Sequence, residues 1–212
     1  MKYPDLTNII GGRKVSVEGQ FLDVFSPLNG ELISRVPLSG SAELDQAVAA
    51  AQKAVPGWAA LPIKERVQVF YRYKTLLENH KDELASIVVE ENGKTTGEAV
   101  AEVLKSIEVT EFACALPQLT AGEIEEVSRG VECRSDRKPL GVIASITPFN
   151  FPNMVPNWTI PNAIALGNAM ILKPSEQTPL SANRLADLLH DAGLPDGVFN
   201  VVHGAREIVE AI

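Results

Sequence analysis

The hydrophobic and polar positions of the chain follow one pattern before about residue 139 and another after it. In the first part, short extended stretches precede stretches whose apolar residues recur every three or four positions, the spacing of a helix packed on one face. The Pro56-Gly57 pair is predicted to end the first of these helices, and Thr95 and Glu98 have the spacing of a capping box at the start of the fourth. A polar stretch that alternates around a glycine predicts an exposed hairpin. The predicted strands are 21–25 and 31–36, the helices 41–55, 62–77, 84–92 and 95–116, and the hairpin 123–137.

After residue 139 the pattern repeats strand, loop, helix and strand. Such units indicate a parallel sheet with helices on its faces, and ligands of these sheets bind beyond the carboxyl ends of the strands, where the loops lie. Three parallel strands leave an apolar edge that needs further strands or another chain, so we expect this chain to be the front part of a larger protein. The predicted strands are 142–146, 169–172 and 198–202, the helices 156–166, 179–192 and 207–212, and the loops 147–152 and 173–178.

Composition and charge exclude several classes of protein. Hydrophobic residues make up 45% of the 212 residues, enough for a folded core. The 19 basic and 27 acidic residues give a net charge of −8, which argues against binding nucleic acid. The uncharged stretch 139–172 is interrupted by prolines and asparagines, which favours a buried segment over a membrane span. Because two cysteines make no disulfide framework and the N-terminus has no signal-peptide core, we expect a cytoplasmic protein.

Several motifs are missing or incomplete. No G-x-G-x-x-G fingerprint occurs, and Gly93-Lys94-Thr95 is not the end of a phosphate-binding loop, because Val88 stands where that motif needs glycine. We interpret this segment as a helix end followed by a cap. The three histidines lie in unrelated contexts, which predicts surface or helix-end positions and no metal site. Cys114 and Cys133 lack the basic setting at a helix N-terminus that activates a thiol, so neither is predicted to be a nucleophile.

The two loops carry the candidate chemistry. In the first, Asn150 places one amide among apolar residues at the carboxyl end of a strand. This amide either bonds its own turn or donates its NH₂ group to an oxyanion. In the second, Lys173 and Glu176 form either a solvated ion pair or a grip on a ribose, and a carboxylate there would repel a 2′-phosphate and favour NAD over NADP.

Taken together, these blocks resemble the aldehyde dehydrogenase superfamily, and within it the CoA-acylating methylmalonate-semialdehyde branch. The resemblance covers the whole chain in order and implies an α/β fold, a Rossmann-like parallel sheet with an N-terminal helical region and an oligomerisation hairpin. It implies strands and helices of the cofactor domain in 1–122, the hairpin in 123–138 and the first βαβ units of the NAD-binding domain in 139–212, with no catalytic domain. The motifs that carry it are Phe149-Asn150-Phe151-Pro152, Lys173-Pro174-Ser175-Glu176 and Gly193-Leu194-Pro195.

The resemblance also implies roles for single residues. Asn150 matches the asparagine that helps to bind the thiohemiacetal oxyanion. Lys105 stands where the branch carries an arginine thought to meet the substrate carboxylate, and a lysine keeps the charge but loses the bidentate fork. The positions that match cofactor contacts are Ile146, Thr147, Pro148 and Phe149 on the nicotinamide side, and Lys173, Glu176 and Gln177 on the ribose side.

The function implied for the complete enzyme is NAD-dependent oxidation of a malonate- or methylmalonate-type semialdehyde to an acyl-CoA. Its partners would be a small aldehyde and further copies of the chain in a dimer or tetramer, with no nucleic acid and no membrane. The nucleophilic cysteine of the family is expected beyond residue 212, so these residues alone are expected to be inactive. The alternatives are a hydrolytic semialdehyde dehydrogenase, such as a succinate-semialdehyde type, and a short non-catalytic protein that binds nucleotide or a partner.

Overall fold

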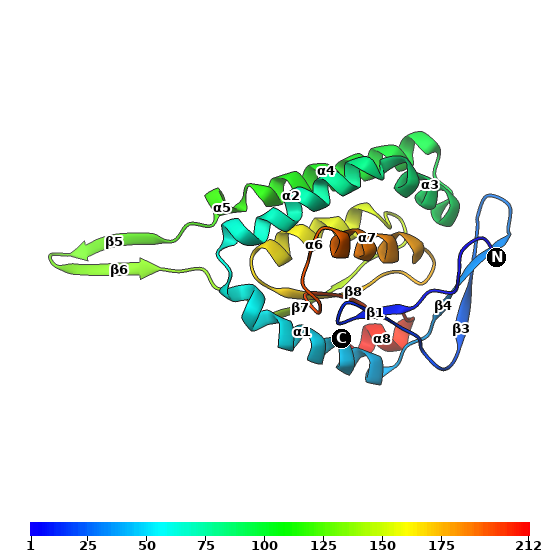
Figure 1. Ribbon diagram of the computed structural model, residues 1–212, viewed down its shortest axis with the longest axis horizontal. Helices are drawn as coiled ribbons and strands as arrows, with labels where there is room; N and C mark the ends of the chain where they lie inside the picture. Colours follow the sequence, from blue (N-terminus) through cyan, green and yellow to red (C-terminus); the bar gives the residue numbers. More distant parts are fainter.

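A five-stranded sheet forms the centre of the computed structural model, which describes residues 1–212 (Figure 1). The strand order is β2-β1-β9-β8-β7. The strands β7 (Val142–Ile146), β8 (Ala169–Lys173) and β9 (Phe199–Val201) are parallel, as predicted, and β1 (Asn8–Ile10) and β2 (Arg13–Val15) extend the sheet in antiparallel fashion. The structure therefore confirms an α/β fold with a parallel core.

The two edges of the parallel strands differ. The hairpin of β1 and β2, which the sequence pattern did not predict, covers β9 through the pair Ile9 and Val201. Its turn is Gly11-Gly12, and both glycines have positive φ, the backbone that two-residue hairpin turns require. On the other side, β7 pairs with β8 alone. The expectation of an unpaired edge is thus wrong at β9 and right at β7.

Helices cover both faces of the sheet. On one face, α1 (Ser41–Ala60) contacts the parallel strands and α8 (Arg206–Ala211). On the other face lie α6 (Met154–Ala165) and α7 (Leu180–Asp191), and an outer layer packs over them (Figure 1). The outer layer consists of α2 (Ile63–Asn79), α3 (Lys81–Asn92) and α4 (Thr96–Cys114), followed by the short α5 (Leu116–Leu119).

The side chains of β8 show how the sheet divides the core. Met170 and Leu172 join the large apolar cluster beneath α6, α7 and the outer layer, whereas Ile171 joins the cluster beneath α1 and α8. This alternation is the period of two that a strand imposes on its side chains. Both faces of β8 are buried, so its apolar run Ala169–Leu172 reflects a core position.

Several local predictions can be compared with the structure. The capping box of Thr95 and Glu98 is present, and α3 ends at Gly93 in the left-handed conformation with φ of 81°. The prediction that Pro56-Gly57 ends the first helix is wrong, because α1 continues through Pro56 to Ala60. The continuation buries Trp58, whose indole Nε1 donates to the carbonyl of Ile164 at 2.8 Å. We attribute the longer helix to this packing, which offsets the hydrogen bond that a proline removes.

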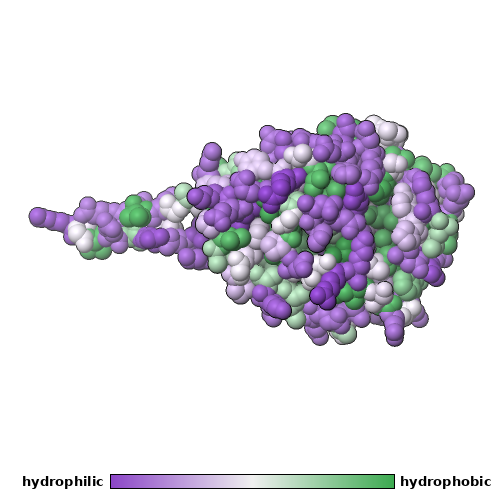
Figure 2. Space-filling view, viewed as in Figure 1, coloured by the Kyte–Doolittle hydropathy of each residue, from purple (hydrophilic) through white to green (hydrophobic).

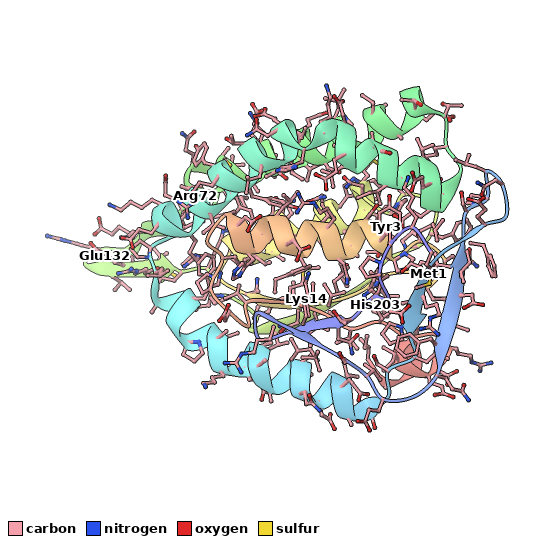
Figure 3. The ribbon with its side chains drawn as sticks, turned by 45° about the vertical axis from the view of Figure 1, so that its right-hand side comes forward. Met1, Tyr3, Lys14, Arg72, Glu132 and His203 are labelled. Atoms are coloured by element: carbon pink, nitrogen blue, oxygen red, sulfur yellow. The ribbon has the colours of Figure 1, made fainter.

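Two smaller sheets lie outside the central one. The strands β3 (Phe21–Phe25) and β4 (Leu32–Pro37) pair near the N-terminus, and β5 (Glu123–Ser128) and β6 (Val131–Ser135) form the predicted hairpin. Every residue of β5 and β6 is exposed, and the hairpin extends from the body as an arm that carries Glu132 (Figures 1 and 3). Hydrophilic and hydrophobic side chains both occur on this arm (Figure 2). No helix of the structure is long and apolar enough to cross a membrane.

Candidate functional site

The two loops singled out by the sequence begin side by side. The register of the parallel strands places Ile146 opposite Lys173, and the N–H of Thr147 donates to the carbonyl of Lys173 at 3.1 Å. Both loops therefore leave the sheet at the carboxyl ends of β7 and β8, where nucleotide-binding α/β proteins hold their ligands. Ile146 and Phe149 are each about half exposed, so the site is an open surface of this chain.

In the second loop, Lys173 and Glu176 form an ion pair with Nζ and Oε2 at 2.9 Å. The lysine side chain is 4% exposed and the glutamate 33%, so a fully solvated surface pair does not describe it. Burial opposes ionisation of Glu176, but the hydrogen bond from Lys173 and a backbone N–H outweigh it and lower the pKa of the carboxyl. The loop thus presents a fixed carboxylate at the surface. Gln177 is exposed beside it, and the backbone N–H of Gln177 donates to the Ser175 hydroxyl at 3.2 Å.

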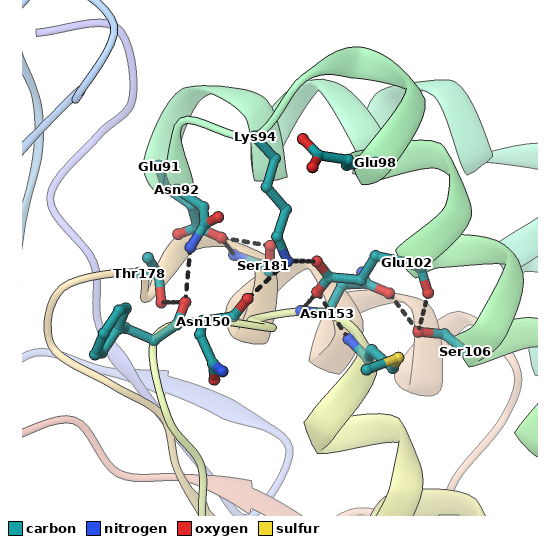
Figure 4. Close-up of polar contacts among 12 residues, drawn as sticks. Glu91, Asn92, Lys94, Glu98, Glu102, Ser106, Asn150, Asn153, Thr178 and Ser181 are labelled. Atoms are coloured by element: carbon teal, nitrogen blue, oxygen red, sulfur yellow. Dashed lines mark hydrogen bonds and ion pairs between the residues drawn. The ribbon is translucent and has the colours of Figure 1, made fainter.

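In the first loop, the Asn150 side chain is exposed and makes no hydrogen bond within the protein. This corrects the prediction of an amide packed among apolar residues, since Pro148 and Phe149 beside it are exposed too. The interpretation in which the amide bonds its own turn has no support, because only the backbone carbonyl of Asn150 is bonded. In Figure 4 the amide points away from the polar cluster that holds this carbonyl, so its NH₂ group is free to donate.

The backbone of this loop is held from the outer helical layer, at the junction of α3 and α4. Asn92 Nδ2 donates to the carbonyl of Phe149 at 2.8 Å, and Lys94 Nζ donates to the carbonyl of Asn150 at 2.6 Å (Figure 4). The Thr178 hydroxyl, from the second loop, also donates to the Phe149 carbonyl at 3.3 Å. Sequence reasoning assigned this junction to a helix end and a cap only, and missed that its side chains reach the site.

Two buried glutamates of the outer layer accept hydrogen bonds from the first turns of the helices that follow the loops. Glu102 accepts from the N–H groups of Asn153 at 2.8 Å and Met154 at 3.1 Å, at the start of α6. Glu91 accepts from the N–H groups of Leu180 at 2.7 Å and Ser181 at 3.0 Å, at the start of α7. Burial raises the pKa of Glu91 to about 7, although these hydrogen bonds favour its charged form.

The sequence offered a signal for both glutamates. Glu91 continues the apolar stripe of α3 after Leu84, Ile87 and Val88, and Glu102 lies one turn after Ala99 on the buried face of α4. A carboxylate on a buried stripe needs donors, and the first N–H groups of a helix lack partners of their own. The pattern could therefore have identified them as caps of other helices.

Lys105 forms no hydrogen bond or ion pair with the residues of the two loops. It lies on the exposed side of α4 and forms an ion pair with Glu108. The prediction that all three histidines lie at the surface or at helix ends is wrong for His203, which is 1% exposed just after β9. Its Nε2 lies 2.7 Å from Asn183 Oδ1, and burial lowers its pKa to about 3, so the ring is neutral at physiological pH.

The remaining candidates for chemistry are away from the loops. Cys114 is buried, and burial raises the pKa of its thiol to about 11, so it is a core residue as predicted. Cys133 lies exposed on the arm. No group of three or more His, Cys, Asp or Glu side chains is placed to hold a metal ion.

A parallel sheet with helices on both faces, and with loops at the carboxyl ends of adjacent strands, places the chain among the doubly wound α/β proteins. More specifically, the chain belongs to the aldehyde dehydrogenase family, whose sequence pattern matches residues 15–212. A malonate-semialdehyde dehydrogenase of Geobacillus thermodenitrificans is 50% identical over 98% of this chain and 43% of its own length. A malonate-semialdehyde dehydrogenase of Pseudomonas aeruginosa is 46% identical over 98% of this chain and 42% of its own length.

Solved structures give the same family. A methylmalonate-semialdehyde dehydrogenase from Oceanimonas doudoroffii superposes with a TM-score of 0.96 at 43% identity, covering 99% of this chain and 43% of its own. A candidate methylmalonate-semialdehyde dehydrogenase from Sinorhizobium meliloti 1021, solved in complex with NAD, superposes with a TM-score of 0.96 at 42% identity, covering 100% of this chain and 43% of its own. The chain thus spans less than half the length of the relatives it matches.

Proposed function

We propose that this chain is the cofactor-binding part of an NAD-dependent dehydrogenase that converts malonate or methylmalonate semialdehyde to an acyl-CoA. One observation supports this above the others. The fixed carboxylate of Glu176 and the free amide of Asn150 lie in the two loops that follow the carboxyl ends of neighbouring strands. The names of the relatives support the substrate class, and the complex of the Sinorhizobium meliloti protein supports the cofactor.

The residues of the second loop fit the adenosine ribose of NAD. A carboxylate accepts hydrogen bonds from ribose hydroxyls, and a buried ammonium held at 2.9 Å keeps that carboxylate ionised and in place. The same negative charge repels the 2′-phosphate of NADP. The first loop would line the nicotinamide side of the cofactor with Ile146, Thr147, Pro148 and Phe149. When bound, NAD supplies the nicotinamide ring that accepts the hydride.

Asn150 would act on the aldehyde. When a thiolate adds to the carbonyl carbon, negative charge develops on the oxygen, and an amide NH₂ oriented toward that oxygen stabilises it. The chain's own thiols do not suit the thiolate role, because Cys114 is buried and protonated and Cys133 is on the arm. We therefore propose that residues outside this chain supply the nucleophile, that acyl transfer to CoA completes the reaction, and that these 212 residues alone do not oxidise aldehydes.

Two further roles belong to the same proposal. Lys105 would meet the carboxylate of the semialdehyde, exchanging its exposed contact with Glu108 for the substrate. The arm would pair with another copy of the chain, since Ile124, Val127 and Val131 are more than half exposed on it and need cover.

The first test is nucleotide binding by the 212-residue chain, measured by titration calorimetry. We expect NAD to bind more tightly than NADP. Glu176→Gln, which keeps the shape but removes the charge, should weaken NAD binding by about tenfold or more and reduce the discrimination against NADP. Equal binding of both nucleotides by the unchanged chain would contradict the assignment of Glu176.

The second test restores the missing part of the enzyme. The chain is joined, in place of the matching segment, to the remainder of the Geobacillus thermodenitrificans relative, and NADH formation is followed with malonate semialdehyde. Asn150→Ala should lower kcat by about 10²–10³-fold while NAD binding is retained. Turnover that needs water alone would favour a hydrolytic enzyme, and a preference for succinate semialdehyde would contradict the substrate class.

A further inference from the structure

Lys94 links the outer helical layer to the loop that carries Asn150. It lies just after the glycine that ends α3, and its side chain is 17% exposed. Its ammonium lies 2.6 Å from the Asn150 carbonyl, 2.5 Å from Glu102 Oε2 and 3.7 Å from the centroid of the Phe151 ring. One cation therefore contacts two neighbouring residues of the loop and the carboxylate that caps the following helix. Figure 4 shows its contacts with Asn150 and Glu102.

The loop needs these contacts because its own backbone is not fixed by secondary structure. No backbone–backbone hydrogen bond involves the N–H or the carbonyl of Phe149 or Asn150. The carbonyls are held by side chains instead, from Asn92 and Thr178 at Phe149 and from Lys94 at Asn150. Since no other contact in the protein holds the Asn150 amide, the backbone that Lys94 fixes sets the region that this amide can reach.

Charge makes the Lys94 contact stronger than its neighbours. An ionised donor to a carbonyl forms a hydrogen bond about twice as strong as a neutral pair. Glu102 is 1% exposed at its side chain, and Lys94 is the cation that neutralises it. The same carboxylate accepts from the N–H groups of Asn153 and Met154, so the middle of the loop and the start of the following helix are tied to one ion pair.

We propose that Lys94 is a positioning residue of the dehydrogenase: through the carbonyl of Asn150 and the Glu102 cap, it orients the Asn150 amide toward the oxyanion. This inference rests on the proposed function of Asn150. Lys94 does not touch the reacting atoms, so its removal changes kcat through Asn150, whereas the Lys173–Glu176 loop and the affinity for NAD are retained.

The test uses the dehydrogenase assembled above from this chain and the remainder of its relative. Lys94→Met alone leaves a buried carboxylate without a cation and can unfold the protein, so the informative variant is Lys94→Met combined with Glu102→Gln. This double variant should keep a melting temperature close to that of the unchanged enzyme but lower kcat by about tenfold or more, with KM for NAD within about twofold. Lys94→Arg with Glu102 unchanged, which keeps a cation and donors at this position, should retain most of the activity that the double variant loses. Lys81→Met removes a surface lysine of α3 that pairs with Asp82 at 3.8 Å, and serves as the control with unchanged kcat.

A second background separates positioning from a merely structural role. In enzyme that already carries Asn150→Ala, Lys94→Met with Glu102→Gln should cost less than about twofold in kcat, because the group it orients is gone. The same loss of kcat in both backgrounds, or a double variant as active as the unchanged enzyme, would overturn the proposal. An Asn150→Ala enzyme with undiminished kcat would instead refute the proposed function of Asn150.

Discussion

Replacing Glu91 by glutamine should change how the stability of the chain depends on pH. Glu91 is buried in the outer layer and accepts hydrogen bonds from the first N–H groups of α7, directly after the loop of Lys173 and Glu176. Burial raises the pKa of this carboxyl from 4.5 to about 7. Glutamine has nearly the same shape and retains an acceptor oxygen, but it does not titrate.

The sign and size of the effect follow from the two pKa values of Glu91. Between them, the unfolded chain has released the proton that the folded chain still holds, so the free energy of unfolding decreases as pH rises. The contribution is fully present below the unfolded value of 4.5 and is lost as pH rises through about 7. At about 1.4 kcal/mol per pKa unit, the difference amounts to about 3 kcal/mol.

Urea unfolding of the chain and of Glu91→Gln at several pH values measures this effect. The comparison matters because carboxyls with lowered pKa, such as Glu83 beside Arg184, lose stabilisation as pH falls and affect both proteins alike. The free energy of the unchanged chain minus that of the variant should fall by about 3 kcal/mol between about pH 4 and pH 8. A difference that stays constant across this range would refute the reasoning that burial dominates the titration of Glu91.

Two further substitutions test the packing that supports the site. Gly93→Ala places a side chain at φ of 81°, where the added Cβ would lie 2.9 Å from a proline ring carbon, and should lower the free energy of unfolding by about 2 kcal/mol. Gly30→Ala has φ of 73° in open space and should cost less, so the difference between the two isolates the contact. Tyr73→Phe removes the buried hydroxyl that donates to Asn157 Oδ1 at 2.9 Å, and should cost about 1–3 kcal/mol in urea unfolding, whereas Tyr71→Phe at an exposed position should cost almost nothing. Equal costs within either pair would contradict these assignments.

The parts of the fold that the sequence predicted well are those with strong local signals. The parallel strands are mainly apolar runs between turn residues, and the capping box of Thr95 and Glu98 is a local spacing. The β1–β2 hairpin was missed because each strand has only three residues, too few for a visible alternation. The wrong end of α1 at Pro56 has the opposite cause, since a tertiary contact of Trp58 overrides a local breaker.

The candidate site was predicted in part. The loops of Asn150 and of Lys173 and Glu176 lie side by side as the strand order required. What the sequence could not show is the set of long-range contacts to them, since Lys94 and Asn150 are 56 positions apart and neither stands in a motif that links them. Lys105 and His203 show the same limit, because exposure depends on which helix face or strand end the remaining chain covers.

The geometry of the outer layer gives a physical reason for its place over the sheet. The short segment from Glu91 to Glu102 holds the start of α7, the two carbonyls of the first loop and the start of α6. Both loops that would receive cofactor and substrate are therefore fixed by the same turn between α3 and α4. Because these contacts come from buried or half-buried groups, loosening this turn leaves buried charges without the partners that compensate for their lost hydration. The stability of the outer layer and the precision of the site are thus coupled, and substitutions at the turn should affect unfolding and turnover together unless, as with Lys94 and Glu102, the charge is removed from both sides.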